Sequence, residues 1–382
     1  MNGLVLSGGG ARAAYQVGVL SYMAEKVPEA QFPIITGVSA GAINAAFLAG
    51  HRGAPRETLE ALSDLWTGLS IEQIFRTDPG SIGLTGARWF WMLGAGGMGP
   101  KVRGLLDTEP LRDFLARHLD AEGIEEKVRN GRLRALALTA TRYSTGQTVT
   151  FVQGQEDAPI WERSRRIGVR TRIEVSHVMA SGSIPLVFPA IKVADEYYGD
   201  GSIRQAAPLA PAIHLGADRL VAISTRYAPT LVEIQERSTS DYPPPAQIIG
   251  MLFNTIFLDT LESDAERLHR INEILKSLPR GVPHPDGLRK IRLLIVRPSR
   301  DLGNMAEGHR RKLPRSLRFM LRGLGIQRLR GPELLSYLLF EMPYLGNVME
   351  MGYEDTMSQW HEVERFFEEE AEAELRPSSP RG

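Results

Sequence analysis

The hydrophobic and polar positions of the first fifty residues predict two strand–turn–helix units in succession. Residues 3–6 form a short apolar run that ends in glycines, and apolar positions then recur at helical spacing over 15–24. Residues 32–36 form a second apolar run that stops at Gly37, and 40–49 follow as a helix of small residues. Strands that alternate with helices at this pace are typical of parallel α/β sheets. We therefore expect a three-layer α/β/α fold with a mainly parallel sheet.

This alternation continues to about residue 225. Helices are expected at 57–69, 108–119 and 172–180, and strands at 133–141, 148–152, 191–193, 196–198 and 219–224. After this point the pattern of hydrophobic and polar positions changes, with a proline-rich break at 242–245, helical periodicity over 248–278 and a late strand near 290–296. We therefore expect an α/β domain over 1–228 and a mostly helical region over 229–382 that packs on it.

The segment 80–104 differs from its surroundings. It is rich in glycine and carries the apolar cluster Trp89, Phe90, Trp91 and Met92. Large apolar residues are usually buried, which favours a helix start docked into the core. Tryptophan also favours the membrane interface, which favours a flap that covers a functional site and dips into lipid. The sequence leaves both interpretations open.

Composition narrows the classes of protein that need to be considered. The 45 basic and 45 acidic residues cancel, so total charge gives no indication of a nucleic-acid partner. The absence of cysteine excludes a disulfide framework, thiol catalysis and cysteine-ligated metal, and no two histidines stand at ligand spacing. No secretory leader and no run of about 20 apolar residues is visible. We expect a cytoplasmic protein without a metal or a nucleic-acid partner.

The strongest chemical motif is Gly37-Val38-Ser39-Ala40-Gly41. It fits the G-x-S-x-G elbow, in which a strand turns sharply into a helix and presents a serine at the turn. A serine there lies at a helix N-terminus, where the helix dipole favours an oxyanion. Serine is also a common helix N-cap, so the pentapeptide alone fits both interpretations.

A second motif, Gly8-Gly9-Gly10-Ala11-Arg12, lies between the first strand and its helix. Consecutive glycines there can direct backbone N–H groups to one point, which makes an anion site or an oxyanion hole, and Arg12 could hold the loop or attract anionic head groups. Gly8-x-Gly10-x-x-Ala13 also matches a dinucleotide fingerprint. That alternative expects an acidic residue about 20 positions later, at the end of the second strand, and none is there.

A third feature is Asp200, in the sequence Tyr198-Gly199-Asp200-Gly201-Ser202. An aspartate between glycines after a short strand is most often a turn residue, and taken alone Asp200 fits that description.

Together, the three features resemble the patatin-like phospholipase family. Further likeness lies in Gly104-Leu105-Leu106-Asp107-Thr108 and in the run from Ala180 to Pro189, so that the resemblance covers roughly 1–225. Two small departures are Ala13, where the family often has glycine, and Ser202, where it often has glycine or alanine. They affect the shape of the loops and remove no reactive group.

The resemblance implies a Ser–Asp dyad, with Ser39 as nucleophile, Asp200 as base and an oxyanion hole built from Gly8, Gly9 and Gly10. It implies a lipid acyl-ester hydrolase that needs no cofactor and acts on phospholipid, lysophospholipid or another acyl ester. An acyltransferase that uses the same acyl-serine, and a non-catalytic lipid- or dinucleotide-binding module, remain alternatives. A Ser–His–Asp triad is a further mechanistic alternative. His177 is the histidine nearest to a motif, and we assign it no role.

The basic stretch 309–330 carries eight arginines and lysines and no acidic residue. From about Pro314 it fits a helix with Arg315, Arg318 and Arg322 on one face, opposite a row of leucines. One interpretation pairs these arginines with the acidic tail 362–374. The other is a peripheral contact with an anionic membrane, in which each basic residue contributes about 1 kcal/mol.

Overall fold

The fold is taken from a computed structural model, which describes residues 1–78, 104–229, 260–277, 287–318 and 332–375, with the single residues 80, 233 and 284. The tryptophan-containing part of 80–104 lies outside these residues. The basic stretch is described as far as Arg318, where residues 315–318 are helical, with Arg315 exposed and Leu317 buried.

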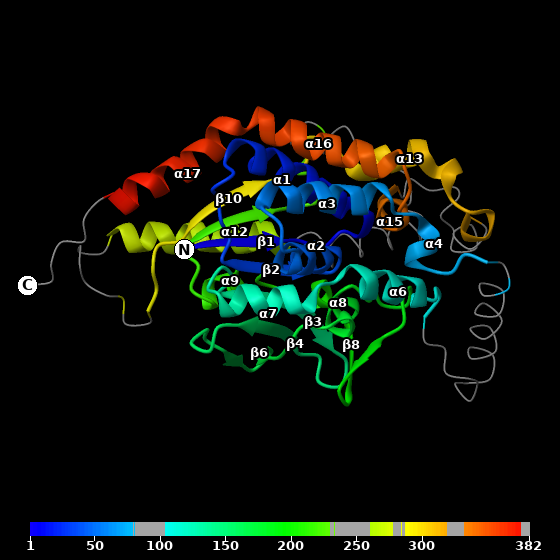
Figure 1. Cartoon of the computed structure of the whole chain (residues 1–382), viewed down its shortest axis with the longest axis horizontal. Helices are drawn as coiled ribbons and strands as arrows, with labels where there is room; N and C mark the ends of the chain where they lie inside the picture. Colours follow the sequence, from blue (N-terminus) through cyan, green and yellow to red (C-terminus); the bar gives the residue numbers. More distant parts are fainter. Residues whose placement is uncertain are drawn as a thin grey trace, which may run out of the picture.

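A mainly parallel sheet forms the centre of the described structure (Figure 1). Its strand order is β10-β9-β1-β2-β3-β4-β6-β5, and β8 pairs with both β3 and β7. The strands are β1 (Asn2–Leu6), β2 (Ile34–Val38), β3 (Ala135–Arg142), β4 (Thr148–Gly154), β5 (Glu162–Arg163), β6 (Arg166–Arg170), β7 (Ile191–Val193), β8 (Glu196–Asp200), β9 (Arg219–Ile223) and β10 (Arg292–Val296). From β10 to β3 every neighbour is parallel.

Helices cover both faces of the sheet. The larger layer contains α1 (Ala14–Lys26), α2 (Ala40–Gly50), α3 (Pro55–Thr67), α4 (Ile71–Ile74), α6 (Glu109–His118), α7 (Ala121–Arg129), α8 (Val175–Ser181), α13 (Leu302–His309), α15 (Pro332–Leu338), α16 (Tyr344–Ser358) and α17 (Trp360–Leu375). The opposite face is covered by α9 (Ala210–His214) and α12 (Thr260–Ser277).

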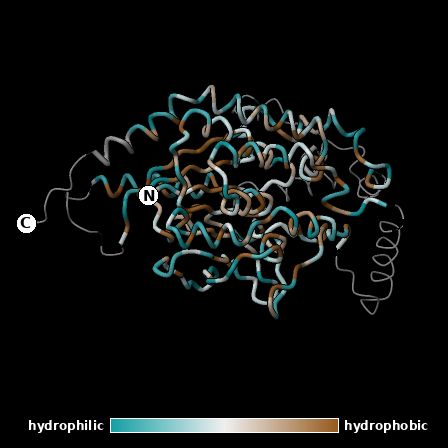
Figure 2. Tube along the Cα trace, in the orientation of Figure 1, coloured by the Kyte–Doolittle hydropathy of each residue, from teal (hydrophilic) through white to brown (hydrophobic). Residues whose placement is uncertain are grey.

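Alternate residues of β1 face different cores. Leu4 and Leu6 pack into the larger core, whereas Val5 packs into the core under α9 and α12. Both faces of the central strands are therefore buried, and Figure 2 shows brown, apolar segments along them and more teal on the outer helices. The predicted α/β/α fold class is confirmed.

The observed elements differ from the sequence prediction at several boundaries. Strand β2 does not stop at Gly37 but continues to Val38, so Ser39 is the first residue after the strand. Helix α8 begins at Val175 and not at 172, because Glu174 N–H donates to His177 Nδ1 in a cap. Helix α7 was not predicted, because it has few apolar positions and its start depends on Asp120 accepting a hydrogen bond from Gly123 N–H.

The C-terminal helices are part of the core rather than an appendage. Helix α16 packs along α1 (Figure 1), and Tyr15 of α1 donates a hydrogen bond to Asp355 of α16 at 3.0 Å, with both residues buried. The two backbones approach so closely that a Cβ atom on Gly352 would lie 2.2 Å from the Tyr15 carbonyl oxygen. Glycine at 352 is therefore required by the packing.

We predict that Gly352→Ala lowers the free energy of unfolding by about 1–3 kcal/mol, because a methyl group there forces the helices apart. The matched control is Gly308→Ala in α13, where an added Cβ meets nothing within 4 Å. That substitution should raise stability by about 0.5–1 kcal/mol. Urea denaturation measures both, and equal effects would contradict the close packing of α16 on α1.

Candidate active site

The serine and glycine motifs lie together at one edge of the sheet. Strands β9, β1 and β2 are adjacent and parallel, so the residues that follow each strand emerge at the same edge. The glycine loop follows β1, Ser39 follows β2, and Ser224 and Thr225 follow β9. Thr225 Oγ1 donates to the Gly8 carbonyl oxygen at 2.5 Å and ties the loop to the end of β9.

Ser39 occupies a strained turn between β2 and α2. Its backbone has φ 56° and ψ −131°, a conformation that costs a residue other than glycine about 1–3 kcal/mol. The flanking glycines make the turn sterically feasible. A Cβ atom on Gly37 would lie 2.4 Å from the Gly41 carbonyl oxygen, and one on Gly41 would lie 2.4 Å from two carbonyl oxygens at the end of β1.

The pairing of β3 brings Asp200 to Ser39 across 161 positions of sequence. Strand β2 pairs with β3 in parallel and ends with Val38 opposite Thr139. Strand β8 pairs with β3 in antiparallel orientation and ends with Asp200 opposite Ala140, the next residue. Strands β2 and β8 therefore approach each other end to end along β3, and the residues that meet are Ser39 and Asp200.

Asp200 is fully buried, and burial raises the pKa of its carboxyl to about 6. Smaller contributions from the nearby Ser39 hydroxyl and from Ser202 lower the pKa. Oδ1 accepts a hydrogen bond from Ser202 N–H at 2.8 Å, whereas Oδ2 has no hydrogen-bond partner among the described residues. The Ser39 hydroxyl is thus close enough to influence the carboxyl, but no formed hydrogen bond joins the two side chains.

The glycine loop faces the serine directly. A Cβ atom on Gly8 would lie 2.9 Å from Ser39 Cβ and 3.6 Å from Ser39 Oγ. Gly9 and Gly10 have φ of 150° and 56°, in the region that favours glycine. The structure therefore brings together five of the six residues singled out from the sequence: Gly8, Gly9, Gly10, Ser39 and Asp200.

Arg12, the sixth, is buried under the C-terminal helix α15. Its Nε donates to Ser336 Oγ at 2.7 Å, and its guanidinium lies 4.8 Å from the centre of the Tyr337 ring. A Cβ atom on Gly10 would lie 2.2 Å from the Tyr337 carbonyl oxygen, so α15 also packs on the glycine loop itself.

Sequence reasoning missed the polar residues that support the serine turn. Ser39 N–H donates to Ser181 Oγ at 3.0 Å, and Ser181 Oγ donates to the Thr139 carbonyl oxygen at 2.6 Å. Ser202 Oγ is buried beside Gly8 and has no hydrogen-bond partner in the described part of the chain. Ser181 lies inside the run 180–189, which is part of the family resemblance. That resemblance was the one signal in the sequence that could have pointed to Ser181.

His177 has a structural environment. Its Nδ1 accepts from Glu174 N–H, its ring meets Phe151 edge-on at 4.7 Å, and burial lowers its pKa. Over the described ranges, no group of three or more histidine and carboxylate side chains could hold a metal ion. None of the helices that the structure describes is both long enough and apolar enough to cross a membrane.

Comparison with known proteins connects this geometry to a family. The model of the family described as patatin-like phospholipase matches residues 4–213, more than half of the 382 residues. The chain belongs to the patatin-like phospholipase family. This is a family of carboxylic-ester hydrolases, and the family and enzyme class predicted from the sequence are confirmed. No curated protein matches the chain.

Solved structures similar to this patatin-like chain include VipD from Legionella pneumophila, with 12% identity and a TM-score of 0.39 over 94% of this chain and 66% of VipD. Another is human GIVD cytosolic phospholipase A2 in complex with methyl γ-linolenyl fluorophosphonate. It has 12% identity and a TM-score of 0.42, over 96% of this chain and 59% of the human protein. The chain thus spans less than two thirds of the length of either protein.

The buried carboxyl leads to a prediction about stability. A carboxyl with a pKa of about 6 instead of 3.8 costs the folded state about 3 kcal/mol when it is ionised. Because the folded pKa is the higher one, this cost appears as the pH rises from about 4 through about 6. Asp200→Asn keeps an Oδ1 that can accept from Ser202 N–H and removes the charge, so it should stabilise the protein at pH 8.

Urea denaturation at pH 8 and pH 4 measures this effect. We expect a gain of up to about 3 kcal/mol at pH 8 and little gain at pH 4, where the wild-type carboxyl is already protonated in the folded state. A loss of stability at pH 8 would mean that Asp200 is a structural turn residue whose charge the fold needs.

Proposed function

We propose that this patatin-like chain hydrolyses acyl esters of lipids, with Ser39 as nucleophile and Asp200 as its base. The observation that supports this most is that a serine in a strained turn lies next to a buried carboxyl. The Oδ2 of that carboxyl has no hydrogen-bond partner among the described residues. Buried polar atoms are rarely left unpaired, and such atoms concentrate at functional sites. A pKa of about 6 allows Asp200 to be ionised at neutral pH while remaining a stronger base than an exposed aspartate.

In the first half of the reaction, Ser39 Oγ attacks the ester carbonyl carbon while its proton passes to Asp200 Oδ2. The carbon–oxygen bond to the alcohol then breaks, and Asp200 returns the proton to the departing alkoxide. This leaves an acyl ester on Ser39. In the second half, water gives a proton to Asp200 and attacks the acyl carbon, and Ser39 takes the proton back as the fatty acid leaves.

The oxyanion that forms in each half needs hydrogen-bond donors. Ser39 N–H is taken by Ser181 Oγ, so it does not supply one. We assign this role to N–H groups of the loop Gly8–Gly10 together with Ala40 N–H, because the first N–H groups of a helix have no partner inside the helix. One such donor typically lowers the barrier by about 2.7–4 kcal/mol.

The substrate class in this proposal is a phospholipid, lysophospholipid or other acyl ester, as family membership implies. The peripheral contact of the basic stretch 309–330 with an anionic membrane stays a prediction.

Hydrolysis of a short soluble ester tests the dyad. We expect Ser39→Ala and Asp200→Asn each to reduce kcat/KM by about 10³-fold or more, and the double variant to be little worse than either single variant, because residues that act as one unit give non-additive losses. Circular dichroism controls for folding. Near-normal turnover in Asp200→Asn would exclude Asp200 as the base.

The contact of Arg12 with α15 predicts a supporting role for the C-terminal helices. Arg12→Met and Ser336→Ala should each lower kcat more than they raise KM, since the loop loses its support while the site keeps its shape. A double-mutant cycle on kcat should show a coupling of about 0.5–3 kcal/mol. Additive losses would mean that the 2.7 Å hydrogen bond has no part in positioning the loop.

A further inference from the structure

A cavity lies away from the proposed catalytic residues. Its volume is about 540 Å³, within the range of about 300–1,000 Å³ found for small-molecule sites. It opens between α1, α2, α3 and α7 on the larger helical layer, and side chains of the sheet such as Leu4 and Ile35 line it. Leu20 and Met23 of α1 and Leu59 of α3 also contribute to a lining that is mostly apolar.

Helix α2 separates this cavity from the serine. Ser39 precedes the first residue of α2, whereas the cavity is lined by Leu48 and Ala49 in the last turn of the same helix. Leu48 and Ala49 follow Ser39 by nine and ten positions, and a rise of about 1.5 Å per residue places them about 14–15 Å from it along the helix. None of the residues assigned to catalysis lines the cavity.

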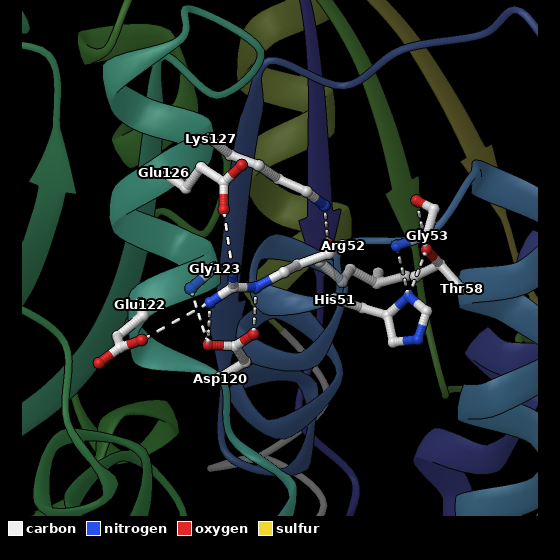
Figure 3. A network of polar contacts seen from close by, with 10 residues as sticks. His51, Arg52, Gly53, Thr58, Asp120, Glu122, Gly123, Glu126 and Lys127 are labelled. Atoms are coloured by element: carbon white, nitrogen blue, oxygen red, sulfur yellow. Dashed lines mark hydrogen bonds and ion pairs between the residues drawn. The ribbon is translucent and has the colours of Figure 1, made fainter.

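The charged groups that line the cavity are, among the described residues, all cations. They are Arg52, Lys127 and Arg132, and no aspartate or glutamate of the described ranges lines it. Arg52 is already neutralised, because it reaches from the end of α2 to α7 and pairs there with Asp120 at 2.7 Å and Glu126 at 3.1 Å (Figure 3). The cations left for a ligand are therefore Lys127 and Arg132.

Lys127 is half-buried at the cavity wall. Its Nζ donates to the Leu48 carbonyl oxygen at 3.0 Å, which uses one of three N–H bonds, and no carboxylate of the described chain lies within ion-pair distance of it. Burial, and to a smaller extent the charge of Arg132, lowers the Lys127 pKa. A half-buried cation without a counter-ion is unfavourable, and an anion held beside it would relieve this cost.

We propose that this cavity binds a free long-chain fatty acid, with the chain in the apolar interior and the carboxylate at Lys127 and Arg132. An anionic head and one long apolar chain are what this combination of two cations and an apolar lining recognises. The carboxylate and the chain are the same whether the fatty acid is the product of the proposed hydrolysis or of another reaction. The binding site does not depend on the catalytic proposal.

Displacement of the fluorescent fatty acid cis-parinarate by palmitate, on the full chain, measures the binding. Lys127→Gln should weaken palmitate binding by about 10-fold to 100-fold, the value of a hydrogen bond to a charged group. Lys127→Arg should retain most of the affinity. Ala30→Trp, which fills the cavity from a half-buried loop position, should abolish binding by steric exclusion. Methyl palmitate, which lacks the charge, should displace the probe poorly.

Arg129→Gln is the matched control, because Arg129 is an exposed cation on the same helix that does not line the cavity. It should leave palmitate binding unchanged. Unchanged affinity in both Lys127→Gln and Ala30→Trp, or an absence of palmitate binding to the wild-type chain, would overturn the proposal. All these variants should hydrolyse a short soluble ester at the wild-type rate. A failure of the catalytic proposal would appear instead as an absence of hydrolysis in the wild type.

Discussion

The site depends on how one edge of β3 is shared between two strands. Strand β2 occupies that edge as far as Thr139, and β8 occupies it from Ala140 onward in the opposite direction. A shift of one residue in either register would turn the interacting side chains to the other face of the sheet. The meeting of Ser39 and Asp200 is therefore a consequence of backbone pairing, and the side chains need no hydrogen bond between them to be held in place.

The other features of the site support the serine turn and the buried carboxyl. The serine turn is strained, and the Ser181 hydroxyl holds it by accepting from Ser39 N–H. The carboxyl is buried without full hydrogen bonding, a cost that the surrounding fold must offset. Part of that support comes from the C-terminal half, because β10 extends the sheet beside β9, α16 packs on α1, and α15 contacts both Arg12 and Gly10.

Much of the fold could be predicted from the sequence, because its strands are short apolar runs and its turns carry glycine. The motifs around Gly8, Ser39 and Asp200 were visible for the same reason: a tight turn leaves a local signature. The burial of Arg12 under α15 could not be predicted, since it depends on a contact between residues 324 positions apart. The cavity at Lys127 could not be predicted either. Its lining comes from several elements, none of which carries a motif, and α7 itself was not predicted.

The central claim is that Ser39 and Asp200 act as one unit because β3 brings them together. The most direct test is the rate at which a fluorophosphonate labels Ser39, measured from pH 4 to pH 9 in the wild type and in Asp200→Asn. The account predicts that the wild-type rate rises with pH through an apparent pKa of about 6, as Asp200 loses its proton. It predicts that the rate in Asp200→Asn is slow and lacks this step. Equal rates and the same pH dependence in the two proteins would contradict it.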